Sequence, residues 1–155
     1  MQVIPIILKI KLEVRNEKYK EIEEIFISLG IEIDDDADFI LTEKNHFSDY
    51  ICCRKNEDIC HVLVSDIIYI ESMGHDINLH TIDETYRVKN RLWQLEKSLN
   101  PEYFLRISNS VIIAKKKVKK IKAALSQKFI LTLDGGSNVD VTRSYYYIFK
   151  NEFGI

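Results

Sequence analysis

Hydrophobic and polar residues follow two different periods in the first part of the chain. Residues 6–14 (IILKIKLEV) alternate with period two, which predicts a half-buried strand. Residues 17–29 carry apolar positions at helical spacing, with Asn16 as the expected N-cap and Gly30 as the expected stop. Two further short strands are predicted at residues 31–33 and 39–41. The pattern therefore predicts a small βαββ unit over residues 1–44.

Three consecutive aspartates, Asp34, Asp35 and Asp36, lie between the two short strands of this unit. Such a run suggests a calcium loop or a phosphoacceptor pocket. The Asp-x-Asn/Asp-x-Asn/Asp-Gly rhythm of a calcium loop is absent, and no aspartate stands alone after a clean apolar run. A solvated acidic turn is the favoured interpretation.

From Asp49 onward the pattern changes to short strands with turn signals every eight to twelve residues, which is typical of an all-β domain. The expected strand segments are residues 50–54, 59–62, 64–72, 77–81, 86–88, 104–113, 128–133 and 139–141. The sequence thus predicts a mainly β domain over residues 45–155. With the preceding βαββ unit, the expected fold class is mainly β, and α+β overall.

Two helices and a basic link interrupt the strands of the second part. Residues 89–99 place Leu92, Leu95 and Leu99 on one face and end before Asn100-Pro101. Trp93 lies beside that face and is expected to anchor the core; the alternative is a platform on which a DNA base stacks. Residues 144–153 predict a short final helix, and residues 115–120 are expected to form a basic link between strands.

Composition narrows the class of protein further. The chain has 155 residues, of which 46% are hydrophobic and 30% charged, so a core can form without a metal or disulfides. Cys52, Cys53 and Cys60 are odd in number, which favours reduced thiols over a disulfide framework. The spacing of Cys52, Cys53, Cys60 and His61 does not fit a zinc site, and we expect no metal or cofactor.

The N-terminus gives no sign of export or of a membrane span. No basic segment precedes its apolar stretch, and Lys9 and Lys11 interrupt that stretch. We therefore expect a cytoplasmic protein that makes no contact with a membrane.

The net charge of −2 conceals two parts of opposite sign. Residues 1–44 hold 6 Lys/Arg and 11 Asp/Glu, a net charge of −5, whereas residues 45–155 hold 16 and 13, a net charge of +3. Between Phe104 and Arg143, nine basic residues accompany only two acidic ones, Asp134 and Asp140. This stretch is where a polyanion would bind.

Motifs for catalysis are absent from the sequence. There is no Gly-x-Ser-x-Gly, Walker loop, dinucleotide-binding glycine pattern or His-Glu-x-x-His, so we expect a protein that is not an enzyme. Asn, Arg and Lys in the basic stretch suit base edges and phosphates of DNA. No helix-turn-helix is evident, so loops or strands would have to read the DNA.

Three blocks in the second part of the chain are distinctive: SDIIYIES at residues 65–72, FLRISNS at 104–110 and VTRSYY at 141–146. With these blocks, the second part of the chain resembles the LytTR-type DNA-binding domain of bacterial transcription regulators. The similarity runs from about Asp49 to the end, some two-thirds of the chain. It implies a β-rich fold of roughly ten strands with a short helix, which presents loops to successive major grooves.

The resemblance also implies three base-contacting positions, which fall on His75, Asn109 and Arg143. Each can form hydrogen bonds to bases. The alternatives are a surface-turn His75, a turn-forming Asn109 and an Arg143 paired with Asp140. Further basic residues are expected to contact phosphates, namely Arg106, Lys115, Lys116, Lys117 and Lys119.

Two departures from the family's usual pattern bear on sequence preference. Family members commonly have His-Arg or His-Lys before the serine and Val-Asn after the next strand, whereas this chain has Ser108-Asn109 and Ile113-Ala114. The preferred DNA sequence is therefore expected to differ.

Regulators of this type commonly carry a full receiver domain, and 44 residues are too few to build one. We therefore expect a response-regulator-like protein without a receiver domain. Residues 1–44 are expected to pack on the DNA-binding domain or to mediate self-association. The expected partner is double-stranded DNA with repeated half-sites, bound by a homodimer. The alternative is a protein-interaction module on the same fold that does not bind DNA.

Overall fold

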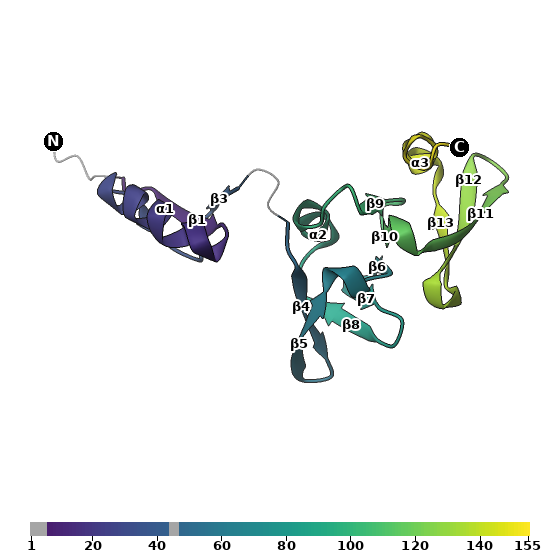
Figure 1. Ribbon diagram of the computed structural model, residues 1–155, viewed down its shortest axis with the longest axis horizontal. Coiled ribbons are helices and arrows are strands. Elements are labelled where there is room, and N and C mark those ends of the chain that lie inside the picture. The colour runs from purple at the N-terminus through teal and green to yellow at the C-terminus, as the bar shows by residue number, and fades with distance from the viewer. Residues whose placement is uncertain (1–5, 44–46) are drawn as a thin grey trace. The chain divides into compact units, whose positions relative to one another are not determined.

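The structure, a computed structural model, describes residues 6–43 and 47–155 (Figure 1). The chain divides into two compact units, residues 1–46 and 47–155. The boundary expected from the sequence, after residue 44, lies outside the described residues. No helix in the described part of the chain is both long and apolar enough to cross a membrane.

The first unit is a three-stranded parallel sheet with one helix. The sheet order is β2-β1-β3, and the elements are β1 (Lys9–Glu13), α1 (Asn16–Ser28), β2 (Glu32–Ile33) and β3 (Phe39–Thr42). Helix α1 begins at Asn16, so Arg15 rather than Asn16 is its N-cap. The chain leaves α1 through Gly30, whose φ of +76° is unfavourable for residues with a side chain. The predicted βαββ order agrees with these elements.

The second unit begins with a seven-stranded antiparallel sheet of order β5-β4-β8-β7-β6-β10-β9. Its strands are β4 (Tyr50–Lys55), β5 (Asp58–Leu63), β6 (Tyr69–Met73), β7 (Asp76–His80), β8 (Thr85–Val88), β9 (Phe104–Arg106) and β10 (Val111–Ala114). Helix α2 (Leu92–Ser98) packs on this sheet and buries Leu92 and Leu95. Buried residues alternate with more exposed ones along β4 and β7, which explains why the sequence pattern predicts strands there.

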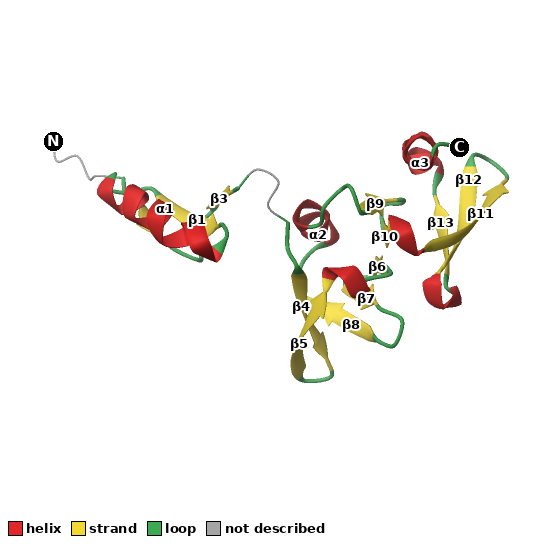
Figure 2. Ribbon diagram, in the orientation of Figure 1, coloured by secondary structure: helices red, strands yellow, loops and turns green. Residues whose placement is uncertain are grey.

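A second sheet, of three antiparallel strands, completes this unit. Its order is β11-β12-β13, formed by β11 (Val118–Ala124), β12 (Lys128–Leu133) and β13 (Asn138–Val141), and it is followed by α3 (Tyr146–Phe153). Phe129, Leu131, Val141 and Phe149 form its core together with Ile107 and Ile113. Figure 2 shows the helices of this unit in red and its strands in yellow.

The predicted fold class is confirmed: the chain is mainly β with short helices. The second unit has ten strands, β4 to β13. Two further local predictions are wrong. The expected basic link at residues 115–120 is a single 3₁₀ turn at Lys115–Lys117 that runs directly into β11. The expected core anchor Trp93 is 54% exposed, because α2 turns Leu92 and Leu95 inward instead.

Candidate nucleic-acid interface

The first of three exposed segments is the hairpin turn between β6 and β7. Met73 pairs with Asp76, so Gly74 and His75 form a two-residue turn. Gly74 has a φ of +62°, a conformation that suits glycine in such turns. The turn leaves the His75 side chain exposed at its tip.

The second segment is the loop between β9 and β10, and Arg106 fixes its shape. The Arg106 guanidinium donates to the carbonyl oxygens of Ser108, at 3.1 Å, and Asn109, at 2.7 Å. It also forms an ion pair with Glu96 at 2.8 Å. Ser108 is buried, and its hydroxyl accepts from the backbone N–H of Ser110. The loop is therefore held while the Asn109 side chain stays exposed.

The third segment follows β13 and is tied to the second by two hydrogen bonds. The backbone N–H of Thr142 donates to the carbonyl oxygen of Ile107 at 3.1 Å. The Tyr145 hydroxyl donates to Oδ1 of Asn109 at 3.3 Å. Arg143 lies between these two anchors in a 3₁₀ turn, and its side chain is exposed. No ion pair joins Arg143 to Asp140 in the part of the chain that the structure describes.

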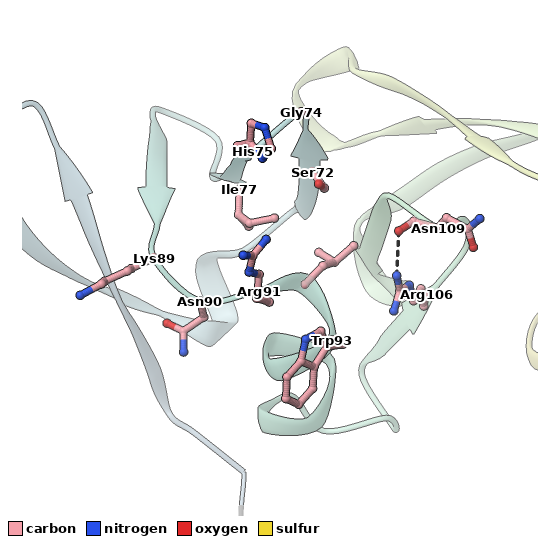
Figure 3. A pocket seen from close by; sticks show the side chains of 11 residues that line it. Ser72, Gly74, His75, Ile77, Lys89, Asn90, Arg91, Trp93, Arg106 and Asn109 are labelled. Carbon is pink, nitrogen blue, oxygen red and sulfur yellow. Dashed lines mark hydrogen bonds between the residues drawn. The ribbon is translucent and has the colours of Figure 1, made fainter. Parts of the chain in front are cut away.

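The first two segments border one cavity of about 350 Å³ (Figure 3). The backbone N–H of Ser72 donates to the carbonyl oxygen of Ser110 at 2.8 Å, which fixes the end of β6 beside the loop. His75 and Asn109 both line the cavity. The structure thus brings His75 and Asn109 to one cavity, and it ties the segment that carries Arg143 to the Asn109 loop through Thr142 and Tyr145.

The same cavity is lined by residues that the sequence did not single out as a site: Lys89, Asn90, Arg91 and Trp93. The first three are exposed and lie between β8 and the start of α2. They were assigned to the helix, but the helix starts only at Leu92, where the side chain of Gln94 accepts from the Arg91 N–H. The run Lys-Asn-Arg just before the first buried leucine was the signal that could have identified them.

Of the five residues expected to contact phosphates, Arg106 lines this cavity and the four lysines lie elsewhere. Strand β10 separates Asn109 from Lys115, Lys116 and Lys117, and the last two line a different cavity. Lys115 forms an ion pair with Glu152 at 2.5 Å. Lys119 lies 3.5 Å from Asp134, and Lys117 lies 3.9 Å from the same carboxylate. Lys116 lies over the Tyr103 ring at 5.4 Å.

Within the described residues, no three His, Cys, Asp or Glu side chains gather as a metal-binding group. The cysteines are free thiols: Cys52 is exposed, Cys60 half-buried and Cys53 buried. Burial raises the pKa of the Cys53 thiol to about 11.

Comparison with known proteins gives one consistent family. The family model of the LytTr DNA-binding domain matches residues 57–154. The transcriptional regulatory protein LytR of Staphylococcus aureus strain bovine RF122 / ET3-1 is 29% identical over 123 residues, which are 79% of this chain and 50% of that protein. The sensory transduction protein LytT of Bacillus subtilis strain 168 is 29% identical over 110 residues, 70% of this chain and 46% of that protein. The chain spans about half the length of these curated relatives.

A solved structure shares the fold. It is the LytTr DNA-binding domain of a putative methyl-accepting/DNA response regulator from Bacillus cereus. Its TM-score is 0.67 at 23% identity, and the match covers 70% of this chain and 99% of that domain.

Proposed function

Because this chain belongs to the LytTR family of DNA-binding domains, we propose that it is a transcription regulator that binds duplex DNA at a specific sequence. One observation carries the proposal. Three exposed segments, distant in sequence, are fixed beside one another by backbone hydrogen bonds, and each presents a side chain that can bond to bases: His75, Asn109 and Arg143. The family is one of DNA-binding domains and not a class of enzymes.

We assign base recognition in the major groove to these three side chains. Arg143 has the fork of donors that matches O6 and N7 of guanine. Asn109 suits adenine, which it can bind through one donor and one acceptor. Because Tyr145 donates to Oδ1 of Asn109, that amide is held with its NH₂ group free and one Oδ1 lone pair still available. Tyr145 is thus a positioning residue for Asn109.

Phosphate contacts are divided between two basic regions in this proposal. Lys89 and Arg91 border the same cavity as the base-reading residues and are placed for direct phosphate contact. Lys115, Lys116, Lys117 and Lys119 act at longer range, by steering DNA toward the protein. Arg106 has internal partners for its guanidinium, so its role is to hold the Asn109 loop.

We further propose that two copies bind repeated half-sites in the cytoplasm, without a cofactor.

We also propose that no aspartyl phosphate in residues 6–43 controls binding. Glu13 and Glu43, at the ends of β1 and β3, are engaged by Lys11 and Arg15. Asp34 pairs with Lys9 and accepts the N–H of Asp36, as in a local turn.

The test is selection from a randomised duplex pool at near-physiological salt, followed by anisotropy measurements on the enriched duplex. We expect an enriched direct repeat and an affinity that falls steeply as salt rises. Arg143→Ala and Asn109→Ala should each cost about 1–3 kcal/mol on the enriched duplex and far less on random DNA.

Arg54→Ala is the matched control, because Arg54 is an exposed arginine of β4 that does not line the cavity. Its affinity should equal that of the wild type. Equal losses on enriched and random duplexes would show that Arg143 and Asn109 contact only phosphates. No enrichment at all would favour the protein-interaction module instead.

A further inference from the structure

The first unit leaves most of its large apolar side chains in solvent. Among residues 6–43, only Ile10 and Leu12 are buried. Nine large apolar residues are exposed: Ile6, Ile7, Leu8, Ile25, Ile27, Leu29, Phe39, Ile40 and Leu41. Small units with so little core usually depend on oligomerisation, a disulfide or a bound metal to remain folded. Neither a disulfide nor a metal-binding group is present in the described part of this unit.

Three of the exposed residues lie on β3. In the register of the sheet, Phe39 pairs with Ile10 and Leu41 pairs with Leu12, so all four side chains share one face. Ile10 and Leu12 are covered on that face, whereas Phe39 is 65% exposed and Leu41 36% exposed. Along the same face, the described part of this unit therefore covers β1 more completely than β3.

The outer edge of β3 is also unpaired among the described residues. β3 bonds to β1 on one side, and no described strand bonds to its other side. Edge strands of soluble proteins are usually protected by lysine, proline or a bulge. The four residues of β3, Phe-Ile-Leu-Thr, have none of these. An apolar edge with a free row of backbone donors and acceptors is therefore available for strand addition.

We propose that this edge joins a second copy of the chain. Strand β3 of each copy pairs antiparallel with the other across a two-fold axis at Ile40. The two sheets become one six-stranded sheet in which the two β3 strands are central. Pairing with a second copy satisfies the free edge and extends apolar cover over Phe39 and Leu41 of both copies. The inference concerns how two copies meet, and it does not depend on DNA binding.

The side chains of β3 are self-complementary in this register. Ile40 meets the partner's Ile40, and Phe39 meets the partner's Leu41, an apolar pair on the face that also carries Ile10 and Leu12. Asp38 meets the partner's Thr42, so no two like charges lie directly opposite. A shift of the axis to Leu41 would instead oppose Phe39 and the partner's Glu43. The register centred on Ile40 is therefore the favourable one.

The charges of α1 are complementary in the same arrangement. Residues 15–20 contain three basic residues and one acidic residue, whereas residues 21–28 contain three acidic residues and no basic one. This order opposes the dipole of the isolated helix, which favours acidic residues at its start and basic residues at its end. An antiparallel pair of sheets places both α1 helices on one face in opposite directions. The basic half of each helix then lies alongside the acidic half of the other.

The first test is sedimentation of the full chain without DNA. We expect a concentration-dependent dimer that Ile40→Lys weakens at least about tenfold, because two ammonium groups would meet at the axis. Ile59→Lys is the matched control: Ile59 is an exposed isoleucine, 66% accessible against 57% for Ile40, on β5, an edge strand of the other unit. A wild-type chain that stays monomeric up to roughly 0.1 mM, or an equal effect of both variants, would overturn the inference.

A disulfide test shows whether the two β3 strands pair at Ile40, even if the Ile40→Lys variant does not fold. Cysteines that face each other across antiparallel strands lie at a separation that a disulfide spans. Under oxidised glutathione, Ile40→Cys should form a covalent dimer and Thr42→Cys should not, because residue 42 is offset from its own copy. The wild-type chain, with its exposed Cys52, sets the background. Equal cross-linking at both positions would disprove the register. DNA affinity, measured separately by anisotropy, shows whether the proposed function stands or fails on its own.

Discussion

The two three-stranded sheets of this protein differ in how completely they cover their own apolar faces. In β11-β12-β13, the inward residues of β12 and β13 are buried, and α3 inserts the fully buried Phe149 against Phe129 and Phe153. In β2-β1-β3, only β1 has buried side chains among the described residues. Both sheets have one helix, but the core of β11-β12-β13 also contains Ile107 and Ile113 from outside that sheet.

Their free edges differ in the same sense. Strand β11 is an edge of its sheet and carries Lys119, Lys120 and Lys122, all exposed, which discourage a further strand. Strand β3 is an edge without any such charge. One sheet is therefore complete and protected, while among residues 6–43 the other has both an open face and an open edge. The complete sheet supports Thr142 and Tyr145 beside the Asn109 loop, where fixed geometry serves recognition.

The largest expected effect contrasts two phenylalanines. Phe149→Ala should lower the free energy of unfolding of the second unit by about 3–5 kcal/mol, because Phe149 is fully buried. Phe39→Ala, at a concentration where the chain is monomeric, should cost less than about 1 kcal/mol, because Phe39 is largely exposed. Urea unfolding followed by circular dichroism measures both. Similar losses for the two variants would contradict the contrast between the sheets.

The second prediction compares the DNA affinity of two variants, one at a lysine that lines the cavity and one at a lysine on the edge strand β11. Lys89→Ala should weaken binding to any duplex about fivefold at 0.15 M salt and reduce the salt slope by about 0.9, as expected for one lost phosphate contact. Lys122→Ala should leave both quantities unchanged, because Lys122 is an exposed residue of the β11 edge. An equal decrease in slope for Lys122→Ala would assign the β11 edge to DNA binding.

The third prediction concerns the link from the complete sheet to the loop. Tyr145→Phe removes the hydroxyl that bonds to Oδ1 of Asn109 and should cost about 0.5 kcal/mol of affinity on the selected duplex, since the bond is exposed. Random DNA should bind as before, and thermal unfolding should not change. If Tyr145→Phe had no effect in an Asn109→Ala background, the hydroxyl would be shown to act through Asn109.

The smallest expected effect concerns the seven-stranded sheet. It tests whether the buried face of this sheet excludes a reagent from solvent, as the buried face of β11-β12-β13 is expected to do. Iodoacetamide at pH 8 should modify Cys52 rapidly and leave Cys53 intact, because Cys53 is buried and its pKa is raised to about 11. Since the pKa of the Cys53 thiol in the folded protein lies above the ordinary thiol value of 9.0, its contribution to stability should be present below pH 9 and lost as the pH rises toward 11. Mass spectrometry of tryptic peptides identifies the modified residue, and early modification of Cys53 would disprove this protection.

Much of the fold followed from local pattern. Period-two alternation predicted β1, and the strands expected at residues 77–81, 128–133 and 139–141 are β7, β12 and β13. The prediction that Trp93 is buried was wrong. An apolar residue next to a row of leucines on a helix is expected in the core, but only the packing of α2 decides which neighbouring residues are covered. The role of Arg106 was hidden because its partners are two backbone oxygens and Glu96, which no side-chain pattern reveals.

The sequence by itself determined the order of strands and helices, the acidic and basic halves, and the identities of His75, Asn109 and Arg143 as candidates. These depend on periodicity, composition and short motifs, which are local properties of a chain. Only the tertiary structure decided that Lys89 and Arg91 share a cavity with His75, that Tyr145 bonds to Asn109, and that β3 is an uncovered edge. Such relations join residues that are distant along the chain, and they are fixed by strand pairing and packing rather than by neighbouring residues.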